Sequence, residues 1–283
     1  MKKYSAVYGF LFALPVVFSA LASSGGFKLE VLPSEINPGD AFVVKITGVN
    51  TSRLPAAFLN DNALYFGTCG KGCFIAVGAV EIETKPGLHT IKVIVDDEEK
   101  KANLSVKRAS FPEISLMLPE EKVFLSPENL KRVDMEEEKL KSIWPMVSDK
   151  LWDGSFSTPL ENSVSTAFGT KRIINEKKIS VHRGLDITGQ EGEDVKAANR
   201  GRVVLTEELF FGGNTVIIDH GYGIYTIYMH LSKFNVKVDN IVSKGEVIGF
   251  VGSSGRTSGP HLHFGVKISN ISANPISLLQ LKL

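Results

Sequence analysis

The sequence has little net charge and, beyond its first residues, no long apolar run. Its 32 Lys and Arg side chains nearly balance 31 Asp and Glu side chains, which gives a formal net charge of +1. Such a balance provides no overall field that would attract nucleic acid or anionic lipid, so we expect no nucleic-acid partner. After Gly26 no stretch approaches the roughly 18 apolar residues of a spanning helix, so we expect no stable membrane association of that part.

An apolar run does occur at the start of the chain. Two lysines follow Met1, and residues 4–21 are then almost entirely apolar. This pattern is typical of a secretory signal, and the small residues around Ala22 suit cleavage before Ser23. The sequence therefore predicts a signal peptide over residues 1–22 and an exported, periplasmic or cell-wall protein. A retained membrane anchor is the alternative, which Pro15 disfavours.

Cysteine is scarce, with only Cys69 and Cys73 present. Export would allow these two to form a disulfide, and the glycines between them permit the tight turn that the bridge requires. A zinc site is the weaker interpretation, because no histidine or third cysteine lies nearby in the sequence. We predict a local disulfide.

The remainder of the chain divides into three parts by composition. Residues 27–108 contain short β-branched runs separated by Pro-Gly turns, which predicts a β-sandwich. Its layout resembles immunoglobulin-like modules, although their Cys and Trp spacing is missing. Residues 109–151 read as a linker with a helix that starts at Ser126-Pro127 and ends before Pro145. We interpret Glu136–Glu138 in that helix as a solvated face.

Residues 152–283 return to short strands joined by glycine-rich turns, so the whole protein is expected to be all-β around one linker helix. The expected strands are residues 216–219, 224–229, 247–251 and 261–268. The glycine-rich segments between them, namely Phe210–Gly213, Lys233–Asn240 and Ser253–Ser258, are expected to form the walls of a groove. Phe210 and Phe211 could equally be core residues.

Histidine and aspartate side chains gather in three short phrases of this last part. The phrases are His182-Arg-Gly-Leu-Asp186, Met229-His230-Leu and His261-Leu-His263. Side chains alternate between the faces of a strand, so His261 and His263 must point the same way. Two imidazoles and one carboxylate can hold a zinc ion while leaving a fourth position for water. Strand geometry alone leaves open which of His261 and His263 would bind the metal.

The combination of HxxxD with a later HxH resembles the lysostaphin-type, or LytM-domain, zinc endopeptidases. Further stretches, such as Ser165–Arg172, Asn214–Gly221 and Gly255–Phe264, are also similar to that family, and the resemblance spans essentially residues 156–279. It implies a barrel-sandwich-like antiparallel β domain.

Carried over to this sequence, the resemblance makes His182, Asp186 and His263 the Zn²⁺ ligands. It makes His230 and His261 the catalytic pair. The substrate that it implies is the stem peptide of bacterial peptidoglycan, whose cross-links such an enzyme hydrolyses. The complete ligand set disfavours the main alternative, a non-catalytic peptidoglycan binder or amidase activator, and a secreted protease of proteins is a third hypothesis.

Three further expectations concern residues outside that set. His220 is expected to be a surface or hydrogen-bonding residue in a turn, and His89 belongs to the first domain, so neither is expected to bind metal. Residues 27–108 are expected to contact the wall or a cell-wall partner protein. The helical linker is expected to cover the groove until it is displaced.

Overall fold

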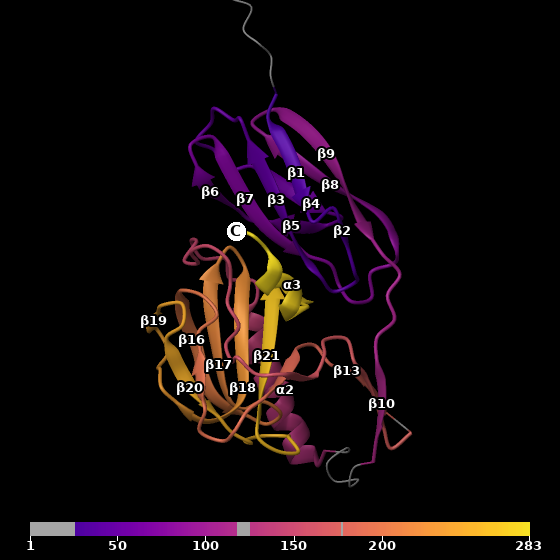
Figure 1. Cartoon of the computed structure of the whole chain (residues 1–283), viewed down its shortest axis with the longest axis vertical. Coiled ribbons are helices and arrows are strands. Elements are labelled where there is room, and N and C mark those ends of the chain that lie inside the picture. Colours follow the sequence, from indigo (N-terminus) through magenta and orange to yellow (C-terminus); the bar gives the residue numbers. More distant parts are fainter. Residues whose placement is uncertain (1–25, 118–124, 177) are drawn as a thin grey trace, which may run out of the picture.

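Strands dominate the protein. The computed structural model describes residues 26–117, 125–176 and 178–283, so the predicted signal peptide lies outside the described residues. Only two helices occur in these ranges, α2 (Pro127–Ile143) and α3 (Pro275–Gln280), which confirms the all-β class (Figure 1). Neither is long and apolar enough to span a bilayer.

The N-terminal region consists of two β-sheets packed on a common apolar cluster. One sheet has the order β1-β3-β7-β6 and the other β2-β9-β8-β4-β5. The strands are β1 Lys28–Leu32, β2 Glu35–Ile36, β3 Ala41–Thr47, β4 Ala56–Leu59, β5 Asn62–Leu64, β6 Phe66–Gly70, β7 Cys73–Ala79, β8 Gly87–Val95 and β9 Glu98–Val106. Cys69 and Cys73 form the predicted disulfide at the β6–β7 turn. The likeness to immunoglobulin modules stays a prediction.

Strands β3 and β7 are buried on both faces. Phe42 and Phe74 point into the cluster between the two N-terminal sheets. Val43 and Ile75, their neighbours along the chain, point the other way and share a cluster with Trp152 and the C-terminal strands. Successive strand residues face opposite sides, so the continuous apolar runs of these two strands serve two cores at once. The first sheet therefore packs directly onto the C-terminal region.

The C-terminal region is built on a ten-stranded sheet with the path β11-β14-β21-β18-β17-β16-β19. Its strands are β11 Val164–Thr166, β14 Leu185–Thr188, β15 Asp194–Lys196, β16 Gly201–Leu209, β17 Gly213–Gly221, β18 Ile224–Phe234, β19 Ile241–Val242, β20 Val247–Val251, β21 His261–Ile268 and β22 Ile271–Ala273. The four strands expected from the sequence are all present, and the pairing is antiparallel throughout.

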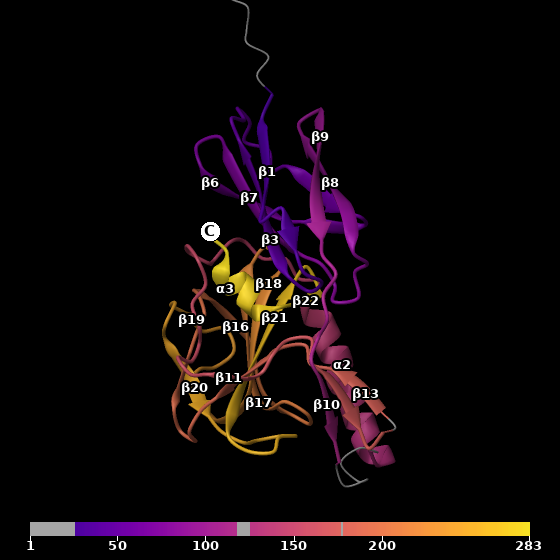
Figure 2. The ribbon, with the colours of Figure 1, turned by 45° about the vertical axis from the view of Figure 1, so that its right-hand side comes forward.

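The linker contributes two elements that lie against this region (Figures 1 and 2). Strand β10 (Glu113–Leu116) pairs in parallel with β12 (Lys171–Ile174), which in turn pairs with β13 (Lys178–Val181). Helix α2 begins where predicted, because the Ser126 side chain accepts a hydrogen bond from the Asn129 N–H and Pro127 occupies the first turn. We keep residues 108 and 151 as proposed boundaries of the linker.

Helix α2 packs on the face of the large sheet that also carries His263. In the β18–β21 pair His263 lies opposite Met229, so both share a face, and Ile227 and Tyr225 follow on that face of β18. The residues at the end of α2, Ile143 and Trp144, form one cluster with Tyr225 and Ile227. The helix therefore covers the part of this face that adjoins His263.

Candidate metal centre and its surroundings

Strands β14 and β21 bring three of the predicted residues together. Asp186 lies directly opposite His263 in their antiparallel pair, and His182 precedes β14 by three residues. His182 Nε2 lies 2.9 Å from Asp186 Oδ1 and 3.0 Å from His263 Nδ1, and the third side, from His263 Nδ1 to Asp186 Oδ1, is 2.8 Å. Three atoms that can each bind a metal thus face one another.

Backbone and side-chain contacts fix the orientation of these ligand atoms. The Nδ1–H of His182 donates to the Ala167 carbonyl at 3.0 Å, which leaves Nε2 with its lone pair toward the cluster. Arg172 of β12 donates to Asp186 Oδ2 at 3.0 Å, so that Oδ1 is the oxygen that faces the histidines. His182 and Asp186 therefore each have a neighbour outside the triangle that sets the ring or carboxylate plane.

The cluster also shifts the ionisation of its members. Burial by itself raises the pKa of Asp186, but contacts with His182 and His263 outweigh burial and hold that pKa well below its ordinary value. Burial lowers the pKa of His263 despite the nearby Asp186. The aspartate is therefore a carboxylate and His263 is neutral near pH 7, which are the forms that bind metal ions.

These three residues fit a tetrahedral metal ion. With metal–ligand bonds of about 2.0–2.1 Å, neighbouring ligand atoms lie roughly 3.3 Å apart, close to the distances in this triangle. Imidazole nitrogens and a carboxylate oxygen that point lone pairs at one another repel unless a cation lies between them. Among the described residues this is the one group of His, Cys, Asp and Glu with metal-binding geometry. The donor set of two nitrogens and one oxygen suits zinc.

Two more histidines flank the triangle, and one loop orients both. The Nδ1–H of His261 donates to the Gly259 carbonyl at 2.9 Å, with Thr257 Oγ1 also near, and its Nε2 lies 3.8 Å from Asp186 Oδ1. The Nδ1–H of His230 donates to the Ser254 carbonyl at 2.9 Å. In both rings Nε2 is therefore the nitrogen that keeps a lone pair.

His230 occupies a strained position on the strand. Its φ of 64° is unusual for a residue with a side chain, and its N–H donates to the Gly212 carbonyl at the tip of the β16–β17 hairpin. Its ring centre lies 4.8 Å from that of His261 and 6.1 Å from that of His263. Burial lowers the pKa of His230 to about 4, so it is neutral at pH 7.

Residues 180–275, which contain all five of these side chains, match the sequence profile described as Peptidase family M23. These residues form a domain of peptidase family M23. The crystal structure of a putative M23 peptidase from Pseudomonas aeruginosa has 27% sequence identity and a TM-score of 0.66, with 86% of this chain and 93% of that chain covered. That similarity extends the match to most of the chain, including the N-terminal region.

Two curated relatives share the M23 domain. The DD-carboxypeptidase/endopeptidase Mpg of Neisseria meningitidis is 42% identical over 115 residues, which is 41% of this chain and 26% of that protein. The peptidoglycan DD-endopeptidase ShyA of Vibrio cholerae is 39% identical over 102 residues, 36% of this chain and 24% of that protein. The chain thus spans about a quarter of the length of these relatives.

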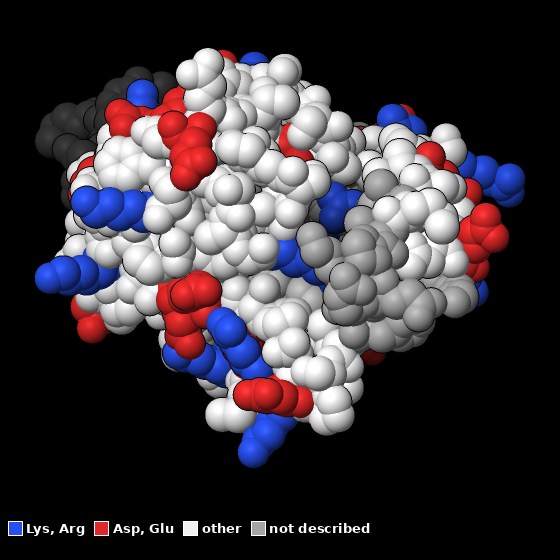
Figure 3. Space-filling view, turned by 90° about the horizontal axis from the view of Figure 1, so that it is seen from below, with Lys and Arg blue, Asp and Glu red and all other residues white. Residues whose placement is uncertain are grey.

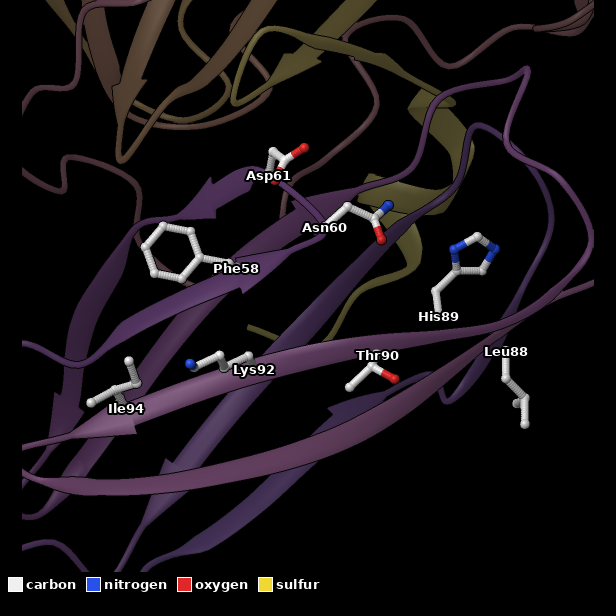
Figure 4. Close-up of a pocket in the computed structure, with 8 residues that line it drawn as sticks. All are labelled: Phe58, Asn60, Asp61, Leu88, His89, Thr90, Lys92 and Ile94. Carbon is white, nitrogen blue, oxygen red and sulfur yellow. The ribbon is translucent and has the colours of Figure 1, made fainter.

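The remaining histidines lie away from the metal centre of the M23 domain. His89 is in the N-terminal region, where its Nε2 is 2.9 Å from the Lys85 carbonyl. It lines a hollow of about 590 Å³ beside Phe58, Asn60 and Thr90 (Figure 4).

The expectation for His220 was partly wrong. It is a hydrogen-bonding residue, but it lies within strand β17 and is fully buried. Its ring nitrogens contact the Arg200 carbonyl at 2.9 Å and Thr226 Oγ1 at 2.7 Å. Burial lowers the pKa of His220 to about 4. The turn that the glycines suggested lies at Tyr222-Gly223, just after the strand that contains His220.

The loops expected to line the groove differ in their contacts. Ser253–Ser258 holds both flanking histidines, as described above. Phe210 and Phe211 are half-buried at the hairpin tip and belong to neither apolar core cluster. The backbone of Lys233–Asn240 instead forms hydrogen bonds with Val203 of β16 and Ile248 of β20.

The acidic run of α2 was only partly solvated. Glu137 and Glu138 are exposed, as expected. Glu136 is not: its side chain is 15% exposed, pairs with Arg132 at 2.7 Å and accepts the Phe210 N–H at 2.8 Å. Because Phe210 lies next to the hairpin tip that binds the His230 N–H, this carboxylate is one contact through which the helix reaches the surroundings of His230.

Several residues around the centre were not predicted to have a role. Arg172 closes one of the family-like stretches, but nothing in its spacing from Asp186 indicated a contact. Gly184, inside the HxxxD phrase, is needed because a Cβ there would lie 2.4 Å from His263 Nε2. A signal for Gly184 was available, since glycine inside a metal-binding phrase suggests close approach of a ligand ring.

Proposed function

We propose that this protein is a zinc-dependent endopeptidase that hydrolyses the peptide cross-links of bacterial peptidoglycan. The observation that carries the proposal is the triangle of His182, Asp186 and His263, with two further oriented histidines beside it. Membership of family M23 and the names of two relatives, a DD-carboxypeptidase/endopeptidase and a peptidoglycan DD-endopeptidase, support the reaction and the substrate.

In this proposal His182, Asp186 and His263 hold the zinc ion. A bound zinc ion supplies a Lewis acid for the scissile carbonyl and lowers the pKa of water. His261 presents its Nε2 toward the centre and accepts a proton from the attacking water. His230, neutral because of burial, can accept a proton at its Nε2, and the N–H formed there would donate to the charge that develops on the carbonyl oxygen.

The setting of the domain is part of the proposal. Peptidoglycan lies outside the cytoplasm, so the protein must be exported, and the apolar start of the sequence supports export to the periplasm or the cell wall. The N-terminal sheets, which share a core with the M23 domain, would place it against the wall or a cell-wall protein.

The test compares the wild-type chain with His263→Ala and His261→Ala for zinc content and for muropeptide release from purified peptidoglycan. We expect one zinc ion per wild-type chain and release of cross-linked peptides as monomers. His263→Ala should lose zinc, because a ligand is removed, whereas His261→Ala should keep zinc. Both variants should be inactive.

Two results would contradict the proposal. If His261→Ala loses zinc while His263→Ala keeps it, the assigned roles are reversed. If the wild-type chain binds zinc and releases nothing but stimulates a wall amidase, the chain is an activator instead of an endopeptidase.

A further inference from the structure

One arginine lies in the loop that orients the two flanking histidines. Arg256 stands between Ser254, whose carbonyl binds His230, and Thr257, whose hydroxyl lies 3.1 Å from His261 Nδ1. Its own N–H donates to the Phe211 carbonyl at 3.0 Å. The backbone of Arg256 is therefore fixed within two residues of both contacts to the histidines.

The side chain of Arg256 is also held in place. Its guanidinium lies over the Phe211 ring, 4.1 Å from the ring centre, a geometry that favours the cation. Yet Arg256 makes no salt bridge with any of the described carboxylates, whereas the neighbouring Arg172 pairs with Asp186. A guanidinium fixed on an aromatic ring without an acidic partner keeps its donors available for a ligand.

The charges around the metal centre leave this arginine uncompensated. Asp186 is the one carboxylate of the triangle, and Arg172 already uses its outer oxygen. Partial burial, and then the like charge of Arg172, lower the pKa of Arg256. Seen from below, some basic side chains lie in the hollowed middle of the molecule, and others lie at its edges together with acidic side chains (Figure 3).

We infer that Arg256 binds a carboxylate of the peptide substrate close to the bond that is cleaved. Arg256 thereby selects peptides that carry a free carboxylate there over peptides in which that group is an amide. The inference rests on the proposed function, because it takes a peptide as the ligand. It adds the substrate charge and the residue that recognises it.

A carboxylate is the anion that best fits these observations. The planar guanidinium offers paired N–H donors that match the two oxygens of a carboxylate, and an amide offers one acceptor and no charge. An added carboxylate would also offset the repulsion between Arg256 and Arg172.

The experiment uses the full zinc-loaded chain and two cross-linked muropeptides. They differ in one group, a free carboxylate or its amide on the residue beside the cleaved bond. We expect wild-type kcat/KM to favour the carboxylate peptide by about tenfold, as for a charge-assisted Arg–carboxylate contact. Arg256→Gln should reduce cleavage of that peptide to the level of the amide peptide, and Arg256→Lys should lie between the two.

The matched control is Arg202→Gln. Arg202 is an exposed arginine of β16 that faces Asp239 at 3.9 Å, so its substitution should leave the preference intact. A carboxylate preference that persists in Arg256→Gln would overturn the inference and leave the proposed function standing.

The same two peptides separate this inference from the proposed function. If the wild-type chain cleaves neither, the proposed function fails, and calorimetric binding of the two peptides decides the inference. Tighter binding of the carboxylate peptide that is lost in Arg256→Gln supports it. Equal binding of both peptides overturns it.

Discussion

The N-terminal and C-terminal regions are both built of strands around apolar cores, but they differ in the polar groups that they bury. Among the described residues of the two N-terminal sheets, Asp40 is the one buried charged or polar side chain. The C-terminal region buries nine, including His182, Asp186, His220 and His230. Burying a polar group costs free energy unless it is hydrogen-bonded. The C-terminal region is therefore the part whose interior is adapted for chemistry.

The buried side chains of the N-terminal region are mainly apolar, and many of them pack against the C-terminal region. The buried apolar side chains of β3 and β7 divide equally between its own core and the cluster that contains Trp152, with five in each. Even Asp40 serves this contact, because its carboxylate accepts from the Asn274 side chain at 2.8 Å. One region thus supplies the reactive groups, and the other supplies a rigid support with a free outer sheet.

Substitutions at two glycines test this difference between the two regions most directly. A Cβ at Gly184 would lie 2.4 Å from His263 Nε2, and a Cβ at Gly78 of β7 would lie 2.5 Å from the Phe42 ring. We expect Gly184→Ala to displace His263, release zinc and lower peptidoglycan cleavage at least about a hundredfold, since a misplaced ligand disrupts the whole centre. Zinc content and muropeptide release measure this.

Gly78→Ala is the matched variant in the apolar region. Overpacking there should lower the free energy of unfolding by roughly 1–3 kcal/mol, while the folded fraction keeps its zinc. Urea unfolding and metal analysis distinguish the two variants. Zinc retention in Gly184→Ala, or zinc loss in folded Gly78→Ala, would contradict the division between a reactive and a supporting region.

The sequence was sufficient for the elements whose pattern is local. Alternation in β21 placed His261 and His263 on one face, and Ser126-Pro127 marked the start of α2. The disulfide followed from two cysteines on a glycine turn. Each of these depends on residues within a few positions of one another, where backbone geometry dictates which side chains meet.

Contacts between distant segments could not be predicted in the same way. Arg172 and Asp186 are 14 residues apart, and Glu136 and Phe210 are 74 apart. In the sequence Glu136 could not be distinguished from a solvated glutamate of a charged helix. The partner that buries it lies in a distant hairpin, and no sequence pattern links that hairpin to the helix. The apolar runs of β3 and β7 did carry a signal for the contact between regions, since strands buried on both faces do not alternate.

His220 provides the next test, because the N-terminal region has no buried histidine. Its pKa of about 4 lies below the 6.5 of an exposed histidine, so between these values the unfolded chain binds a proton that the folded chain excludes. The free energy of unfolding should therefore fall as the pH falls from 6.5 toward 4. At pH 5 the loss attributable to His220 should be about 2 kcal/mol.

His220→Gln isolates this effect. The variant keeps an amide that can bond to the Arg200 carbonyl or Thr226, but it has no proton to gain in this range. The titrating residues of the metal centre are common to both proteins, so the difference between their urea unfolding curves at pH 7 and pH 5 reports His220 alone. Parallel losses in the two proteins would mean that His220 is protonated without unfolding.

The smallest expected effect concerns α2, the helix of the linker that connects the two regions in the sequence. Glu136 accepts the Phe210 N–H and pairs with Arg132, whose own guanidinium donates to the Glu208 carbonyl at 2.9 Å. The hairpin tip held in this way binds the His230 N–H through Gly212. Glu136→Ala should therefore lower kcat by about fivefold, roughly the 1 kcal/mol of one hydrogen bond, with KM little changed.

Glu138→Ala is the control, because Glu138 lies two residues away on the same helix, is exposed and pairs only with Lys141 among the described residues. Glu136→Gln keeps an oxygen that can accept the Phe210 N–H, so it should recover part of the lost kcat if that bond positions His230. A uniform loss of stability with unchanged kcat in Glu136→Ala would show that α2 only packs on the sheet. If kcat instead falls in Glu136→Ala and partly recovers in Glu136→Gln, the hydrogen bond from the linker helix helps to position His230.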